Sequence, residues 1–230
     1  MQDKFQLTLA QNTFVAKKRL VSQIYHISRF ENCKTTLLQT EKIIQNRNDA
    51  GVSLDDIGVI VALKRGFEFV FFYLNTCQAD NTLPSFDVAL MCRINGIVAV
   101  HDALIPGVLR TGQVGVTLYD GSRHEPVAQT DSDVERYLEA LANSAMSQTE
   151  RALRAMLYMM RSQLFWDGNK RTAILFANAW LIWHGCGVLE IDEVHFDEFN
   201  LKLSEYYKTG DMDEILLFIH RHCIQGMTLA

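Results

Sequence analysis

Hydrophobic positions repeat along most of the chain at the three- and four-residue intervals of one helix face. Segments 132–141 and 147–160 show this repeat, and segment 173–184 is apolar nearly all round. A helix of the last kind belongs at the centre of a bundle. Segment 113–126 instead alternates polar and apolar residues and contains an Asp-Gly step, which predicts a β-hairpin. The pattern therefore predicts an all-α, mainly helical bundle that carries one small β-hairpin.

Several helix boundaries are marked by residues with known capping roles. Gly185 follows the apolar segment, where a left-handed residue would end the helix. Three serines each stand three residues before an acidic residue, which is the spacing of a capping box. These pairs are Ser53 with Asp56, Ser132 with Glu135, and Ser147 with Glu150. The stretch 57–74 is strongly apolar, but charged residues interrupt it, which favours a buried helix over a membrane span.

Length and composition narrow the class of protein. The chain has 230 residues, which one domain with a short appendage accounts for. Polar residues near 46–51 predict a boundary between an N-terminal helical segment, residues 1–48, and a main domain, residues 49–230. The formal net charge of −5, without a long run of one sign, argues against a nucleic-acid surface. Residues 1–10 lack a signal-peptide core, so we expect a cytoplasmic protein without a membrane anchor.

The candidate chemistry lies in segment 163–173. One helix is expected to end near Ser162 and another to begin near Arg171, with a short loop between them. The loop supplies Gly168 and Asn169, the two residue types that most easily adopt positive φ angles. Backbone N–H groups in such a turn converge into an anion-binding nest, and the next helix adds its positive end.

The charged residues of this loop indicate the class of ligand. Lys170 and Arg171 add positive charge, and arginine suits bidentate contact with phosphate oxygens. Asp167 offers a hard oxygen ligand beside the nest, as a phosphate-bound Mg²⁺ requires. These residues predict binding of a di- or triphosphate with its metal. The alternative from the same residues is an ordinary surface turn followed by a charged helix start.

The loop resembles the signature of the Fic family, His-x-Phe-x-Asp/Glu-Gly-Asn-Gly/Lys-Arg-x-x-Arg. The positions that match in order and spacing are Phe165, Asp167, Gly168, Asn169, Lys170 and Arg171. Two positions depart from the signature. Gln163 stands where the family has its histidine, and Ile174 stands where it has its second arginine. The resemblance implies the mainly helical Fic fold.

The resemblance extends over roughly residues 20–226. Segment 109–116 resembles the approach to the hairpin, called the flap, that holds the target protein in Fic proteins by strand addition. The flap residues that this implies are Val114, Gly115, Val116 and Gly121. Glu31, with the residues up to Thr40, resembles the inhibitory helix of Fic proteins that carry an N-terminal inhibitor.

The resemblance also implies roles for the loop residues. Fic proteins typically transfer AMP from ATP to a hydroxyl group of a target protein. By resemblance, Asp167 would hold Mg²⁺, and Arg171 would contact the outer phosphate oxygens during the reaction. The residues that would bind the nucleotide are Gly168, Asn169, Lys170 and Arg171. The partner implied is a target protein that the sequence does not identify, and such proteins often form homodimers.

Gln163 stands at the position of the family's general base. An amide does not titrate near neutral pH, and loss of a general base typically costs about 10²–10⁴-fold in rate. We therefore expect ATP and Mg²⁺ to bind, and AMP transfer to be weak or absent. Two alternatives stand beside this prediction. One is a non-catalytic nucleotide-binding or regulatory module, and the other is a phosphotransferase like the Doc toxins, which share the Asn-Lys-Arg step.

The sequence leaves two alternative roles for each of two further residues. His124 follows the hairpin tip and is the candidate to replace the missing base; otherwise it is an exposed loop histidine. Glu31 would pair in the family with the second arginine, which is Ile174 here. It is therefore expected to pair with Arg171 or Lys170, or else to be an ordinary surface charge.

Overall fold

The computed structural model describes residues 1–47 and 51–228 and is built mainly of helices, as predicted. The α-helices are α1 (Leu9–Lys18), α2 (Leu20–Ser28), α3 (Leu37–Ile44), α4 (Leu54–Ala79), α5 (Val88–Val98), α6 (Asp131–Ala142), α7 (Gln148–Ser162), α8 (Asn169–Trp183), α9 (Glu193–Thr209) and α10 (Asp213–His222). A short 3₁₀-helix, η1 (Arg29–Glu31), follows α2. The strands are β1 (Val116–Thr117), β2 (Arg123–His124), β3 (Val188–Leu189) and β4 (Ile224–Gln225).

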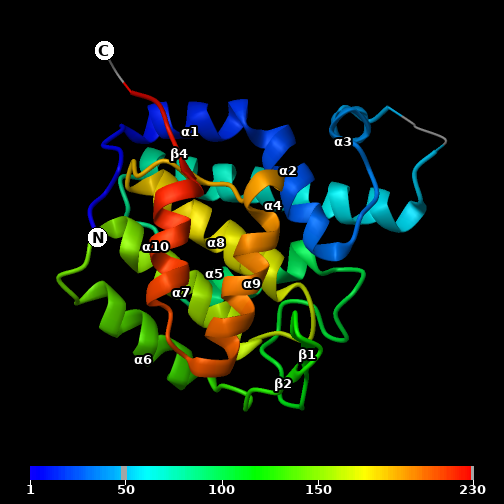
Figure 1. Cartoon of the computed structure of the whole chain (residues 1–230). Coiled ribbons are helices and arrows are strands. Elements are labelled where there is room, and N and C mark those ends of the chain that lie inside the picture. Colours follow the sequence, from blue (N-terminus) through cyan, green and yellow to red (C-terminus); the bar gives the residue numbers. More distant parts are fainter. Residues whose placement is uncertain (48–50, 229–230) are drawn as a thin grey trace.

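Helix α8 forms the centre of the bundle, as its nearly uniform apolar sequence predicts. It packs against α7, α5, α4 and α1, and Figure 1 shows it enclosed by these helices and by α9 and α10. Its residues from Ala173 to Ile182 are all buried. Gly185 has a φ angle of +69° two residues after the helix ends. The central position of α8 fixes its N-terminus, and therefore the loop that precedes it, within the fold.

Two of the three predicted helix starts are confirmed. Ser53 caps α4 and Ser147 caps α7, each accepting a hydrogen bond from the backbone three residues on. The prediction for Ser132 is wrong, because Thr130 caps α6 and Ser132 lies inside that helix. Thr130 and Asp133 form the reciprocal capping box there.

The predicted hairpin is present between α5 and α6, as β1 and β2. The strands are antiparallel, with Val116 opposite His124, and Gly121 has a φ angle of +82° in the turn between them. A second pair, β3 with β4, joins residues 188–189 to residues 224–225 and was not predicted. Each pair is a two-stranded sheet, so β1 and β2 keep an unpaired edge among the described residues.

The N-terminal helices pack on the main bundle. Asn12 is buried and donates from its Nδ2 to the carbonyl oxygens of Leu181 (3.0 Å) and Gly187 (2.9 Å). The α2 helix packs against α4 and carries η1 at its end, with α3 beyond it at the edge of the molecule (Figure 1). The boundary predicted at residues 48 and 49 lies outside the described residues. None of the described helices combines the length and the apolar character needed to cross a membrane.

Candidate functional site at the loop before the central helix

The candidate site is the loop at residues 163–168, called the motif loop below, with the first turn of α8. Helix α7 ends at Ser162, and Gln163 follows in the left-handed region with φ 46° and ψ 60°. Gly168 is also left-handed, with φ 70°, and α8 begins directly after it. These two positive φ angles reverse the chain direction within six residues. The turn is therefore of the kind that the sequence predicts, although Gln163 rather than Asn169 takes one of the left-handed positions.

Asn169 holds the motif loop together through its side chain. Its Oδ1 accepts a hydrogen bond from the backbone nitrogen of Phe165 (2.8 Å), and its Nδ2 donates to the carbonyl oxygen of Phe165 (2.9 Å). The same Nδ2 lies 3.2 Å from Oε1 of Gln163. The amide of Asn169 is therefore engaged with the loop itself, and contact with a ligand falls to the backbone of this residue.

Gly168 is needed for packing as well as for its φ angle. A Cβ atom at this position would lie 2.6 Å from the Cβ of Ala99, at the end of α5. The Gly168 backbone nitrogen donates to Oδ1 of Asp167 (2.5 Å). A side chain at residue 168 would therefore push the loop away from α5.

Asn95 on α5 holds the motif loop through its side chain, and no pattern in the sequence predicts this role. Its Nδ2 donates to the carbonyl oxygen of Asp167 (2.9 Å) and to Oγ1 of Thr172 (3.0 Å). Its Oδ1 accepts a hydrogen bond from the backbone nitrogen of Gly107 (2.9 Å). This fully buried amide thus ties α5, the motif loop and the chain that leads to the flap.

Arg171 lies completely buried beneath the motif loop and is surrounded by carboxylates. Its Nε is 2.7 Å from Oε1 of Glu31, and its Nη1 is 2.8 Å from Oδ2 of Asp102. Its Nη2 is 3.8 Å from Oδ1 of Asp167, and neither Nη2 nor Nε has hydrogen-bond geometry to a partner among the described residues. The Nη1 group also donates to the carbonyl oxygen of Val98 (2.6 Å). The structure thus resolves the open assignment of Glu31: it pairs with Arg171.

Burial dominates the electrostatics of this cluster. It raises the pKa of Glu31, and the neighbouring Arg171 guanidinium offsets only part of that effect. Burial also lowers the pKa of Lys170, against the opposing influence of Glu31 and Asp167. The Nζ atom of Lys170 lies 5.6 Å from the centre of the Phe30 ring, at the face of the aromatic group. The positive charge of Arg171 is therefore already offset in large part by acidic neighbours.

Gln163 is buried, and its side chain is fully engaged. Its Nε2 donates to the carbonyl oxygen of Met160 (2.5 Å) and lies 3.4 Å from the Tyr207 hydroxyl. Burial raises the pKa of Tyr207, so that hydroxyl stays protonated and does not replace a base.

His124, the candidate replacement base, is not an exposed loop residue. It lies on β2 and is partly buried, and its Nε2 is 2.8 Å from the carbonyl oxygen of Arg161. Its ring packs against that of Tyr207, with centroids 5.0 Å apart. The imidazole is thus held by α7 and α9, which leaves Nδ1 as its remaining polar atom.

A pocket of about 190 Å³ lies between the flap, α9 and Lys170. The flap contributes residues 116–119, and α9 contributes Asn200, Leu203, Ser204 and Tyr207. Two contacts attach the flap tip to α9. The Ser204 hydroxyl accepts a hydrogen bond from the backbone nitrogen of Tyr119 (2.9 Å), and Lys208 pairs with Asp120 (2.7 Å). The flap therefore forms one wall of this pocket.

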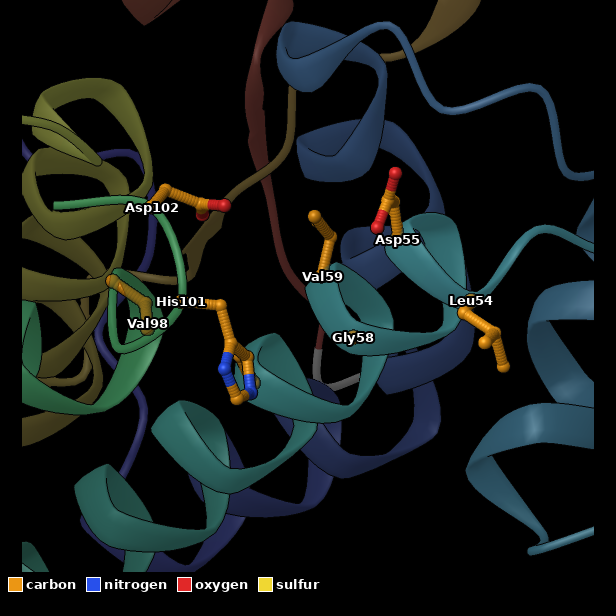
Figure 2. Close-up of a pocket in the computed structure, with 8 residues that line it drawn as sticks. Leu54, Asp55, Gly58, Val59, Val98, His101 and Asp102 are labelled. Carbon is orange, nitrogen blue, oxygen red and sulfur yellow. The ribbon is translucent and has the colours of Figure 1, made fainter.

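A second hollow of about 330 Å³ lies between the start of α4 and the turn that follows α5. Figure 2 shows Asp55 and Val59 on α4, with His101 and Asp102 across the gap from them. Val98 and Asp102 line this hollow and also contact Arg171. No group of three or more His, Cys, Asp or Glu residues within the described ranges could hold a metal ion.

The structure brings together most of the predicted site residues. Gln163, Asp167, Gly168, Asn169, Lys170, Arg171 and Glu31 all lie at the motif loop. Of the predicted flap residues, Val116 lines the pocket beside Lys170, whereas Val114, Gly115 and Gly121 are not among its lining residues. Asn95, Asp102 and Arg110 were not identified as site residues. A lone Asn, Asp or Arg in a sequence gives no signal of which loop it will contact.

Part of the chain is similar to a known protein family. Residues 85–181 match the model of the Fic/DOC family. No curated protein sequence shows a significant match to the chain.

Three solved structures with similar folds are described as Fic proteins. A Fic domain-containing signaling protein of Bacteroides thetaiotaomicron has a TM-score of 0.71 at 17% identity, and the match covers 94% of this chain and 85% of that one. Residues 134–508 of Fic-1 from C. elegans give a TM-score of 0.73 at 19% identity, covering 92% of this chain and 63% of that one. A Fic family protein of Desulfovibrio desulfuricans gives 0.69 at 16% identity, covering 89% and 62%.

The present chain therefore spans less than two thirds of the last two structures. At these identities the likeness concerns the fold, and it extends over helices on both sides of the matched segment. Residues 85–181 thus match the Fic/DOC family model, and the chain as a whole has the fold of these Fic structures.

Proposed function

We propose that this protein binds a nucleoside triphosphate with Mg²⁺ and that it is related to the protein adenylyltransferases, with AMP transfer weak or absent. The observation that carries the binding proposal is the pocket between the flap and α9, which ends at Lys170 beside the start of α8. A small pocket that borders a cation in the first turn of a helix suits a ligand with a polyphosphate and a flat base.

The phosphate end of the proposed ligand would lie at the first turn of α8. No side chain within the described residues caps this helix, so its first N–H groups are available to an acceptor. The helix dipole and Lys170 add positive potential at that point. Gly168 and Asn169 would contribute through their backbone, because the Asn169 amide is engaged with Phe165.

The base would occupy the pocket beneath the flap. Its volume of about 190 Å³ is below the range usual for a whole drug-sized ligand, which suits a flat ring whose sugar and phosphates extend outside. Asn200 and Ser204 supply polar groups there, and Tyr119 and Tyr207 supply aromatic surface. The exposed edge of the flap would remain free to bind the backbone of a target protein by strand addition.

Mg²⁺ fits this arrangement through Asp167. The carboxylate is about half exposed, and its Oδ1 contacts Gly168 and faces Arg171, which leaves Oδ2 for a metal. Mg²⁺ commonly binds one or two carboxylates and takes its remaining ligands from phosphates and water. Bound in this way, the ion would neutralise phosphate charge. One protein carboxylate, that of Asp167, would suffice for such an ion.

Gln163 accounts for the weak or absent transfer. Its amide donates to Met160 and lies next to Tyr207, and it does not titrate in the physiological range. A non-catalytic nucleotide-binding or regulatory module is the second candidate function, because the engaged side chain of Gln163 favours a binding site without a base. The two functions differ only in whether any labelled protein forms.

Glu31 would regulate the site. It holds Arg171 from the side of η1, and Asp102 holds the same guanidinium from the end of α5. An outer phosphate of the nucleotide would compete with these carboxylates for Arg171, so the pairs would weaken triphosphate binding.

Calorimetry with MgATP tests the binding proposal. Wild-type protein should bind it, and Lys170→Met should weaken binding by about tenfold or more through the loss of a charged contact. Lys202→Met is the matched control, because Lys202 lies on α9 and pairs with Glu198 and Glu214 (both 3.6 Å) away from the loop. No binding by wild type at millimolar nucleotide, or equal effects of the two substitutions, would contradict the proposal.

Labelling with a tagged ATP tests the catalytic proposal. Gln163→His restores a group that titrates near neutral pH and should produce labelled protein in a cell extract. The wild-type protein should give little or none. If the Gln163→His variant is folded and binds MgATP but labels no protein, the result would contradict the transferase relationship. It would support the second candidate function, a non-catalytic nucleotide-binding module.

A further inference from the structure

Arg110 connects the flap to the motif loop through one buried guanidinium group. It is 2% exposed and lies just before the flap. Its Nη1 donates to the carbonyl oxygen of Gly112 (2.6 Å), and its Nη2 donates to that of Pro126 (2.7 Å). These two carbonyls belong to the two ends of the hairpin, on either side of β1 and β2.

The same guanidinium also donates hydrogen bonds to the end of α7. Its Nε donates to the carbonyl oxygen of Gln163 (2.5 Å), and its Nη2 lies 3.2 Å from that of Ser162. The backbone nitrogen of Arg110 also donates to the carbonyl oxygen of Leu164 (2.9 Å). Four side-chain contacts therefore join both ends of the flap to the left-handed turn at Gln163.

No carboxylate in the described chain pairs with Arg110. A buried charge without a counter-ion is costly unless hydrogen bonds replace its hydration. Here backbone carbonyl oxygens do so, and these acceptors neither titrate nor rotate away. The planar guanidinium group of arginine can donate to carbonyl oxygens on three separate segments at once. A lysine could not do so, because it has a single ammonium group.

A second contact places the flap directly on the motif loop. A Cβ atom on Gly112 would lie 2.6 Å from the six-membered ring of Trp166. The chain next to it forms an isolated antiparallel bridge from Leu109 to Phe165. The chain that enters the flap therefore packs directly against the motif loop, and the buried side chain of Arg110 adds hydrogen bonds to this contact.

We infer that Arg110 is a positioning residue that fixes the base of the flap against the Gln163 turn, so that the pocket wall and the motif loop move as one unit. The positioning role of Arg110 does not depend on the proposed function. One consequence does rest on it: a nucleotide bound in the pocket would meet the motif loop in a single geometry. The tip of the flap has separate attachments on α9, from Asp120 to Lys208 and from Tyr119 to Ser204. Loss of Arg110 would therefore release the base of the flap, so that the two contacts at the tip alone would have to protect the hairpin from opening.

Hydrogen exchange without nucleotide tests the inference in the wild-type protein first. The backbone nitrogens of Arg110 and Leu118 are hydrogen-bonded, in the loop contact and in the flap respectively. If the two segments form one unit, they should exchange with the same free energy of opening as urea is raised. Opening of the flap at a lower free energy than the loop contact would overturn the inference, whatever the protein binds.

Substitutions then identify Arg110 as the cause. Arg110→Lys and Arg110→Gln should each speed exchange at Leu118 by about tenfold or more relative to residues of α8. Arg151→Gln is the matched control. Its Nη2 donates to the carbonyl oxygen of Ser144 (2.5 Å), at the opposite end of α7 from Gln163. Equal acceleration of the flap in the control, or rescue by lysine, would assign Arg110 an ordinary structural role.

A spectroscopic signal adds a readout that general destabilisation would not move. The protein has three tryptophans, so fluorotryptophan labelling gives three ¹⁹F resonances, and Trp166→Phe assigns the one at the loop. In Arg110→Lys the Trp166 signal should shift or broaden while those of Trp180 and Trp183 stay unchanged. Uniform changes in all three signals would contradict the positioning role. Neither measurement involves nucleotide binding. Failure of the positioning role can therefore be distinguished from failure of the proposed function.

Discussion

Two arginines are buried at the motif loop, and their surroundings differ in kind. Arg110 donates to backbone carbonyl oxygens of the flap and of the α7 end. Arg171, on α8, faces the carboxylates of Glu31, Asp102 and Asp167. Carbonyl oxygens keep their partial charge at every pH, whereas carboxylates gain protons and can be drawn away by another cation. The first arginine therefore acts as a fixed clamp, and the second is the centre of a cluster that can respond to ligands and pH.

The largest effect on stability is expected for Arg110→Gln. This change removes the donor from one buried and three partly buried hydrogen bonds, and an unpaired buried carbonyl costs about 1–3 kcal/mol. We expect the free energy of unfolding to fall by about 4 kcal/mol, measured by urea denaturation, and to fall equally at pH 5 and pH 8. A loss that disappears at pH 5 would show that a titrating partner, absent from the described contacts, neutralises Arg110.

A smaller and pH-dependent effect is expected for Arg171→Gln. The change leaves Glu31 and Asp102 close together without their cation, and breaking a buried pair costs about 3 kcal/mol at neutral pH. The pKa of Glu31, already raised by burial, would rise further. A group with a raised folded-state pKa contributes stability below its unfolded pKa and loses it as pH rises, so the deficit should shrink from pH 7 towards pH 5. A deficit that stays constant over this range would contradict the cluster.

Glu31→Gln should change stability by less than about 1 kcal/mol at pH 7, and in the stabilising direction. Burial raises the pKa of Glu31 in the folded state, so its ionised form is destabilising relative to the unfolded chain. The neutral variant removes that penalty, and Asp102 remains to pair with Arg171. The difference from wild type, followed by thermal unfolding, should grow as pH rises from 5 to 7. A marked loss of stability at pH 7 would mean that the ion pair outweighs burial.

The smallest effect is expected for Asp120→Asn at the flap tip. A hydrogen bond from Lys208, followed by those from Ser122, lowers the pKa of Asp120, but this carboxylate is exposed to solvent. Exposed pairs contribute little, so unfolding by urea should be unchanged. Exchange at the flap should rise by less than about threefold, well below the effect of Arg110→Lys. An equal or larger rise would place the main attachment of the flap at its tip.

The sequence predicted the elements better than their contacts. Helical repeats and an Asp-Gly turn are local, so the central helix and the hairpin could be located, and the contiguous loop residues necessarily lie together. The start of α6 was misplaced because Thr130 and Ser132 both stand three residues before an acidic residue, and local spacing cannot choose between them. The β3–β4 pair joins segments far apart in the chain and has no local signal.

The site shows the same limit at the level of single side chains. The choice of Arg171 over Lys170 as the partner of Glu31 depends on how η1 packs against α8, and the sequence left it open. The contacts of Arg110, Asn95 and Asp102 each join segments that only the tertiary fold brings together. An isolated arginine before a hairpin has the same local pattern as a surface charge, so its burial could not be inferred.

The most direct test of the account is the affinity of ATP relative to AMP, each with Mg²⁺, in wild-type protein and in Glu31→Gln. If Glu31 competes with outer phosphates for Arg171, the variant should bind ATP about tenfold tighter, whereas AMP, which lacks those phosphates, should bind within about twofold of wild type. Equal tightening for both nucleotides, or no change for ATP, would contradict the proposed competition at Arg171.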